Sequence, residues 1–251
     1  MMTYATLENL RSLKLTGMLK ELEAQLNTPE TLKLSFEERI GLMIDAELAE
    51  KENRRLRTRL KKARIGQNAC VEDIDWTASR QLDRDFFRSL AALNWLNHHR
   101  NLCMIGPTGV GKSFLASALS QKACRDGYTV FFERSTRLFK RLADSKITGA
   151  YSSLLSEIAK TDLLVIDDFG LKKLDEEARL DLLEIMESRY ETRSTLVTSQ
   201  LPIDHWHDTI GDPTIADAVL DRLIHNAHVL VLKGDSIRKA KGKKKSEPQG
   251  E

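Results

Sequence analysis

The sequence predicts an α/β protein in which helices cover both faces of a parallel sheet, together with a smaller helical amino-terminal region. Three observations lead to this fold class. Short apolar segments alternate with helix-forming segments in the second half of the chain, a glycine-rich turn joins one of them to a helix, and the first part carries apolar side chains at helical spacing. The predicted parts are a helical amino-terminal domain (1–68), a linker (69–82), an α/β core (83–238) and a basic, disordered tail (239–251).

The amino-terminal domain is expected to contain two helices. Leucines recur near helical spacing from Leu7 to Leu26, which predicts one helix that Pro29 interrupts. A second, long helix is predicted to open at Ser35, because Ser35 and Glu38 have the spacing of a capping box. The sequence Gly66-Gln67-Asn68 is expected to end it.

The core is expected to contain five parallel strands. Each candidate segment is short, apolar and partly β-branched or aromatic, as strands buried on both faces are. A helix over 83–97 precedes the first strand. The predicted strands are 102–105, 128–132, 162–166, 195–198 and 228–232.

Residues 106–113 form the phosphate-binding pattern G-x-x-x-x-G-K-[ST] between the first strand and its helix. Glycines let backbone amides turn inward, and the helix amino terminus adds positive potential for a polyphosphate. Lys112 is expected to reach the β and γ phosphates of ATP, and Ser113 to bind Mg²⁺. The alternative is a glycine turn that binds nothing. The candidate nucleotide ligands are Gly106, Pro107, Thr108, Gly109, Val110, Gly111, Lys112 and Ser113.

Two adjacent carboxylates, Asp167 and Asp168, follow the third buried strand. Carboxylates at such a position are costly unless a cation or hydrogen-bond donor meets them, and nucleotide-bound Mg²⁺ is the obvious partner. We expect Asp167 to hold the Mg²⁺ and Asp168 to orient or deprotonate the attacking water. The alternative is an aspartate turn before Gly170.

Composition narrows the class of protein without choosing a function. The formal net charge of the 251 residues is only +2, so an argument for nucleic-acid binding has to rest on local clusters. Three cysteines without C-x-x-C spacing indicate neither a disulfide framework nor a zinc site, which favours the reducing cytoplasm. No segment reads as an export signal or a membrane span.

Two basic clusters suggest contact with DNA. At helical spacing each could follow a track of phosphates, which predicts binding to double-stranded DNA without sequence preference. The alternative is two solvated helix faces. The clusters are Arg54, Arg57, Lys61 and Arg64 in the long amino-terminal helix, and Arg134, Arg137, Lys140 and Arg141 after the second strand.

These motifs together resemble the AAA+ ATPases of the helicase-loader clade, and more narrowly the IstB-like family, whose members assist insertion-sequence transposases. The resemblance extends over nearly the whole chain, including its helical amino-terminal region. The residues that carry it are the glycine-rich loop, Asp167-Asp168, Thr198-Ser199-Gln200, Asp221-Arg222-Leu223 and Gly234-Asp235-Ser236-Ile237-Arg238.

The resemblance implies a ring or helical oligomer in which ATP lies between neighbouring subunits. Gln200 matches a polar residue near the γ-phosphate, Arg222 matches an arginine inserted into the neighbour's site, and Arg238 matches a second arginine sensor. An arginine supplied in this way raises the rate by roughly 10³- to 10⁵-fold. The alternatives are an ion pair of Arg222 with Asp221 or Asp217, and an Arg238 that simply belongs to the basic tail.

The chain departs from the wider AAA+ pattern in two places. Asp168 stands where most AAA+ proteins have glutamate, which shortens the reach of the carboxylate and predicts slow hydrolysis. Few residues follow the fifth strand, so the usual helical lid has little room and closure over the nucleotide has to rely on the neighbouring subunit.

The predicted function is a Mg²⁺-dependent ATPase, slow and stimulated by assembly on DNA, that assists a cognate transposase in target selection or strand transfer. A replicative helicase loader is the nearest alternative. A small-molecule P-loop kinase would need an acceptor pocket and a mobile lid. A nucleotide-dependent DNA scaffold with negligible turnover is a third alternative.

Overall fold

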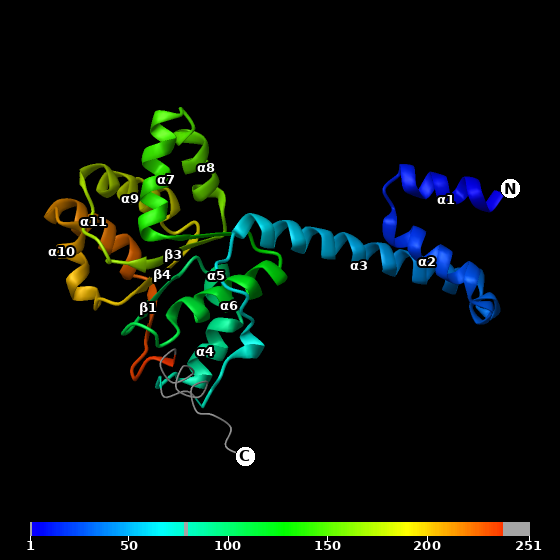
Figure 1. Cartoon of the computed structure of the whole chain (residues 1–251), viewed down its shortest axis with the longest axis horizontal. Coiled ribbons are helices and arrows are strands. Elements are labelled where there is room, and N and C mark those ends of the chain that lie inside the picture. Colours follow the sequence, from blue (N-terminus) through cyan, green and yellow to red (C-terminus); the bar gives the residue numbers. More distant parts are fainter. Residues whose placement is uncertain (1, 78–79, 238–251) are drawn as a thin grey trace, which may run out of the picture. The chain divides into compact units, whose positions relative to one another are not determined.

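The computed structural model describes residues 2–77 and 80–237 (Figure 1). The chain divides after Thr58 into two compact units, one helical and the other α/β. The long helix α3 (Phe36–Ala63) runs across this division.

The helical unit holds one more helix than the sequence indicated. The leucine pattern predicted a single helix before Pro29, but the chain turns at Lys14, whose φ of 57° is left-handed. Leucine spacing alone did not reveal this break, because the pattern continues on both sides of it. The elements before α3 are α1 (Met2–Ser12), α2 (Thr16–Asn27) and η1 (Pro29–Lys33).

Glu47 and Gly17 explain why α2 begins where it does. The Glu47 Oε2 atom accepts hydrogen bonds from the backbone N–H groups of Gly17 (2.7 Å) and Met18 (3.2 Å), so a carboxylate from α3 satisfies the first amides of α2. A Cβ atom at Gly17 would lie 2.3 Å from the Ala46 carbonyl oxygen, so only glycine allows this approach.

The start of α3 is as predicted, and its end comes earlier. The Ser35 N–H donates to Glu38 Oε2 (2.8 Å) and the Glu38 N–H donates to Ser35 Oγ (3.2 Å), which confirms the capping box. The helix ends at Ala63 because Arg64 takes a left-handed φ of 53°. Arg64 therefore lies just beyond the helix that was expected to carry it.

The α/β unit is built on a five-stranded parallel sheet, which confirms the predicted fold class. The strand order is β2-β3-β4-β1-β5, so β1 lies between β4 and the edge strand β5. Each observed strand begins within two residues of the predicted first residue. They are β1 (Asn101–Ile105), β2 (Val130–Arg134), β3 (Leu163–Phe169), β4 (Ser194–Ser199) and β5 (Ala227–Val231).

Helices cover both faces of this sheet (Figure 1). One face packs Ile105, Ile166 and Val197 against α7 to α11, with Trp206 fully buried among them. The other face packs against α6, whose Leu115 and Leu119 are buried. The helices are α6 (Lys112–Arg125), α7 (Ser135–Ile147), α8 (Tyr151–Lys160), α9 (Glu176–Arg189), α10 (Trp206–Ile210) and α11 (Pro213–Ile224), with η3 (Ile203–His205) before α10.

The segment that leads into β1 differs from the single helix predicted over 83–97. It forms α4 (Arg84–Ala91) and α5 (Asn94–Asn97), separated by Leu93 with a left-handed φ of 60°. The Trp95 indole N–H donates to the Leu90 carbonyl oxygen (2.9 Å) across this break. A short turn, η2 (Val71–Asp73), precedes α4 within the region predicted as a linker.

Candidate nucleotide site

The glycine-rich loop joins the carboxyl end of β1 to α6. Gly109 and Gly111 have φ angles of 86° and 101°, which side chains other than glycine rarely adopt. A Cβ atom at Gly109 would lie 2.2 Å from Ser236 Oγ. The loop therefore folds as the phosphate-binding pattern requires, with the amino terminus of the 14-residue helix α6 behind it.

Lys112 is buried within this loop. Its Nζ atom donates hydrogen bonds to the carbonyl oxygens of Gly106 (2.6 Å) and Pro107 (2.9 Å). The backbone of the loop therefore surrounds the ammonium group and holds it in place. A cation at this position lies beside the helix amino terminus, where phosphates are stabilised.

Asp167, on β3, contacts residues from both α6 and β4. Its Oδ1 atom accepts hydrogen bonds from the hydroxyl groups of Ser113 (2.8 Å) and Thr198 (2.7 Å). Asp167 is only 2% exposed, and these two hydroxyls compensate the burial of its Oδ1 atom, while the Arg134 guanidinium lies 4.0 Å from its Oδ2 atom. Thr198 was named from the sequence only as part of the fourth-strand motif, and its contact with Asp167 was not predicted.

Asp168 lies within β3, but its backbone departs from the regular strand conformation. Its φ of 57° is left-handed, and the pairing of β3 with β4 shifts register between Ile166 and Phe169. The Asp168 N–H donates to Thr198 Oγ1 (2.9 Å). One threonine hydroxyl therefore fixes both aspartates, donating to the side chain of the first and accepting from the backbone of the second.

Arg134 lies beside the aspartate pair. Its Nε atom is 4.0 Å from Asp167 Oδ2 and 3.8 Å from Asp168 Oδ2. The parallel register of β2 with β3 places Arg134 opposite Asp167, which explains the proximity. Sequence spacing predicted that Arg134 belongs to a DNA-facing stripe, and in the structure it also lies next to the two carboxylates.

Gln200 follows β4 and contacts the glycine-rich loop. Its Oε1 atom accepts a hydrogen bond from the Thr108 hydroxyl (2.6 Å). The structure therefore brings Gln200 to the loop that is proposed to bind the phosphates.

Lys112, Ser113, Asp168 and Gln200 line one cavity of about 440 Å³, whereas Asp167 lines a smaller pocket next to Ser113. The cavity wall also includes Ile237, from the motif after the fifth strand, and Arg80, which sequence reasoning did not single out. Arg80 precedes the core and had no motif to mark it. The lining residues are Gln67, Asp73, Asp75, Arg80, Thr108, Gly109, Gly111, Lys112, Ser113, Phe114, Arg134, Asp168, Gln200 and Ile237.

Arg222 is not brought into this cavity. It lies on α11, where its Nη2 atom pairs with Glu187 Oε1 (3.1 Å) rather than with Asp221 or Asp217. The Asn101 side chain donates to the Arg222 carbonyl oxygen (3.1 Å), so Arg222 lies at the beginning of β1, the end opposite to the loop. Arg238, the other predicted arginine, lies outside the described residues.

The other members of the second basic cluster differ in their surroundings. Arg137 lies 3.7 Å from Glu133, and Arg141 lies 3.6 Å from Glu157 and over the Phe131 ring. Lys140 lines a second cavity.

In the first cluster all four side chains are exposed, with Arg54, Arg57 and Lys61 on α3. Arg64 follows the end of that helix and lines a small pocket with Ser113, Arg134 and Asp167.

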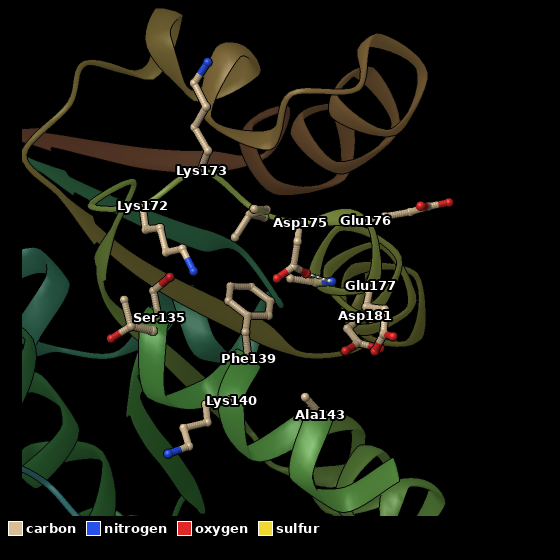
Figure 2. A pocket seen from close by; sticks show the side chains of 13 residues that line it. Ser135, Phe139, Lys140, Ala143, Lys172, Lys173, Asp175, Glu176, Glu177 and Asp181 are labelled. Atoms are coloured by element: carbon tan, nitrogen blue, oxygen red, sulfur yellow. Dashed lines mark hydrogen bonds between the residues drawn. The ribbon is translucent and has the colours of Figure 1, made fainter. Parts of the chain in front are cut away.

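The second cavity, of about 610 Å³, lies between α7 and the segment before α9. Lys140 and Lys172 lie on one side of it, and the carboxylates of Glu177 and Asp181 lie on the other (Figure 2). Lys146 pairs with Asp181 (2.9 Å) and Glu177 (3.3 Å). This cavity is larger than the one at the loop, but it has mixed charge and no glycine-rich loop, so the smaller cavity is the candidate nucleotide site.

The sheet order and the glycine-rich loop facing an aspartate pair define a P-loop nucleotide-binding protein of the AAA+ class. Among solved structures with this fold are DnaI (TM-score 0.58, 19% identity, covering 66% of this chain and 91% of that one) and AMPPCP-bound DnaA from Aquifex aeolicus (TM-score 0.58, 15% identity, 74% and 57%). The family described as IstB-like ATP binding protein matches residues 8–246. The chain belongs to this family.

Relatives within the family carry insertion-sequence names. The insertion sequence ATP-binding protein y4pL of Sinorhizobium fredii is 45% identical over 97% of this chain and 100% of its own length. The ATP-binding protein of insertion sequence IS1162 of Pseudomonas fluorescens is 43% identical over 80% of this chain and 88% of its own. The insertion-sequence ATP-binding protein Rv3427c of Mycobacterium tuberculosis is 33% identical, with 92% and 93% covered.

Within the described ranges, no helix combines the length and the apolar character needed to cross a lipid bilayer.

Proposed function

We propose that the protein is a Mg²⁺-dependent cytoplasmic ATPase that assembles on double-stranded DNA with ATP bound and assists a cognate transposase in target selection or strand transfer. The observation that supports hydrolysis most directly is the convergence of the Ser113 and Thr198 hydroxyls on Asp167 beside the loop. The insertion-sequence names of relatives up to 45% identical support the link to transposition.

The residues present fit a magnesium ion bound together with a nucleotide. Ser113 and Asp167 offer the hard oxygen donors that Mg²⁺ prefers. No three His, Cys, Asp or Glu side chains in the described part of the chain cluster as a complete metal site. This agrees with a cation held by one carboxylate, one hydroxyl, water and substrate phosphates. When bound, Mg²⁺ would neutralise charge that develops on the phosphoryl group.

The remaining steps, phosphate binding and activation of the attacking water, are assigned to side chains and backbone amides of the protein. Lys112 and the loop amides bind the β and γ phosphates, and Gln200 lies on the same wall to orient the attacking water. Asp168 accepts the proton of that water. Because an aspartate reaches less far than a glutamate, we propose that turnover is slow until assembly completes the site.

Arg222 is proposed to complete the site of a neighbouring subunit. It lies at the beginning of β1, away from its own loop, so it acts on another copy of the chain or not at all. Its partner Glu187 is 52% exposed, which leaves the ion pair accessible to exchange for a phosphate. A ring or helical oligomer with head-to-tail contacts provides such an arrangement.

DNA contact is proposed for the basic side chains on the surface of each unit. Arg54, Arg57, Lys61 and Lys140 are exposed. Arg134, Arg137 and Arg141 have acidic neighbours, so their share in DNA binding is expected to be smaller than that of Lys140. Contacts with phosphates bring salt dependence and little sequence preference.

The test is electron microscopy of the protein on duplex DNA with a non-hydrolysable ATP analogue, combined with measurements of ATP hydrolysis. We expect ordered assemblies for the parent and for Asp168→Asn, turnover for the parent only, and neither for Lys112→Ala. Assembly and turnover by Lys112→Ala at the parent's level would contradict the proposal.

Two alternative functions are separated by further measurements. A helicase loader shares the fold, since the DnaC helicase loader matches with a TM-score of 0.50 at 20% identity. Affinity purification with the element's transposase and with the replicative helicase distinguishes the two partners. A DNA scaffold with negligible turnover predicts that the parent and Asp168→Asn release phosphate at the same background rate.

A further inference from the structure

Arg80 is a buried guanidinium group on the wall of the candidate nucleotide cavity. Its side chain belongs to the segment that precedes α4, 26 residues before the first glycine of the loop. Only 3% of Arg80 is exposed. Arginine is rarely buried to this degree without a paired anion.

Among the described residues, Arg80 forms no hydrogen-bonded ion pair with a carboxylate, although the charge of Asp75 acts on it. Its Nη2 atom donates to the Asp75 backbone carbonyl oxygen (2.8 Å), and no described residue accepts a hydrogen bond from its Nε atom. Burial lowers the pKa of the Arg80 guanidinium, while the charge of Asp75 acts in the opposite direction. A buried cation in this state is prepared for an anionic ligand.

Arg80 faces the part of the loop that receives phosphates. A Cβ atom at Gly111 would lie 2.9 Å from Arg80 Nη1. Gly111 is the N-cap of α6, the residue at which the helix amino terminus presents its unsatisfied amides. The guanidinium and these amides therefore face the same region of the cavity.

The backbone around Arg80 is fixed by the segment that follows β5. Its carbonyl oxygen accepts a hydrogen bond from the Lys233 N–H (3.1 Å), and the Ile237 N–H donates to the Gly109 carbonyl oxygen (3.0 Å). The segments before α4 and after β5 therefore meet at the glycine-rich loop and hold Arg80 there.

We propose that Arg80 is a second cationic ligand of the bound nucleotide, contacting phosphates that a nucleoside diphosphate and a nucleoside triphosphate share. This inference rests on the proposed nucleotide site and adds a ligand from outside the loop. We assign Arg80 to the shared phosphates because of its position. It lies next to Gly111, whereas Asp168 and Gln200 are assigned to the γ-phosphate that is hydrolysed.

The test compares Arg80→Met, Arg80→Lys and the control Arg88→Met in the full-length protein. Arg88 is an exposed arginine on α4 whose side chain is 60% exposed, so it controls for loss of a nearby positive charge. Affinities for fluorescent mant-ATP and mant-ADP are measured, together with the melting temperature without nucleotide.

We expect Arg80→Met to weaken both nucleotides by a similar factor, about 10- to 100-fold, which is the range for a charge-assisted hydrogen bond. Arg80→Lys should recover part of the loss, and Arg88→Met should bind as the parent does. Without nucleotide, Arg80→Met should melt within about 3 °C of the parent, since the side-chain hydrogen bond that it loses goes to a backbone carbonyl oxygen and not to a described carboxylate.

Unchanged affinity of Arg80→Met for both nucleotides would overturn the inference, as would a loss confined to mant-ATP. A large fall in melting temperature that accounts for the lost affinity would make Arg80 a structural residue instead. If the parent itself binds neither nucleotide, it is the proposed function that fails.

Discussion

The Arg134 guanidinium lies 3.8 Å from the Asp168 carboxylate, at the end of the strand that leads directly into α7. Arg134 thus connects the proposed water-activating carboxylate to the helix that carries Lys140. Two residues from one predicted DNA-binding stripe are therefore expected to have different roles.

The first prediction separates these two roles. Arg134→Ala should lower ATP turnover about 10- to 100-fold, because a cation beside the transferred phosphoryl group is lost, and should change DNA affinity less than twofold. Lys140→Ala should weaken DNA binding and leave basal turnover unchanged. Phosphate release and fluorescence anisotropy with labelled duplex DNA measure the two effects. If Arg134→Ala affects only DNA binding, the assignment to the aspartate pair is wrong.

The second prediction concerns the hydroxyl group that fixes both aspartates. Thr198→Val keeps the shape of the side chain but leaves the Asp168 N–H and the Asp167 carboxylate each without one partner. We expect about 1–3 kcal/mol of lost stability and a higher Mg²⁺ concentration for half-maximal turnover. Urea unfolding and a magnesium titration measure these changes.

The control for this change is Thr209→Val. Thr209 is also buried, but among the described residues its hydroxyl bonds only to the His205 carbonyl oxygen, at the start of α10. Thr209→Val should have the same magnesium dependence of turnover as the parent. If both variants need more Mg²⁺ for half-maximal turnover, the effect of Thr198→Val comes from loss of stability alone.

The third prediction tests whether Arg222 acts on a neighbouring subunit. Asp168→Asn, which is expected to assemble, and Arg222→Ala should each be nearly inactive alone. A random equal mixture should recover about a quarter of the parent's rate, because one site in four then combines an intact Asp168 with a neighbour's intact Arg222. Glu187→Gln, which removes only the ion-pair partner of Arg222, should remain active. A mixture no faster than the average of its components would refute action between subunits.

The fourth prediction concerns the dependence of stability on pH. Burial, with a smaller contribution from the charge of Arg100, lowers the pKa of His228 below 6.5. Because the unfolded chain then binds more protons than the folded one, stability should fall as pH drops from about 6.5 towards the folded pKa. His228→Gln should make the melting temperature less dependent on pH over this interval. An unchanged slope would mean that other groups control it.

Much of the sheet was predictable because its segments are apolar and short. Each β-strand was expected within two residues of its start, and the glycine-rich loop was identified by its own motif. Strand order was not accessible in the same way, since the pairing of β4 between β3 and β1 joins segments distant in sequence.

The site was predicted in the parts that local sequence determines. Lys112, Ser113, Gln200 and the aspartate pair are brought to one region, as expected. The position of Arg134 beside the aspartate pair depends on its register opposite Asp167 in a neighbouring strand. Local sequence does not reveal this register, and the helical spacing of the basic residues indicated only a DNA-facing stripe. Arg80 reaches the cavity only through tertiary packing, so no local pattern could indicate it.

The hydrogen bonds that Lys233 and Ile237 make to Arg80 and Gly109 have a practical consequence for anyone handling this protein. Shortening the chain to Leu232 would remove the support behind the loop while sparing every strand. Affinity tags are therefore better fused to the amino terminus, and a truncated preparation that folds well could still bind ATP poorly.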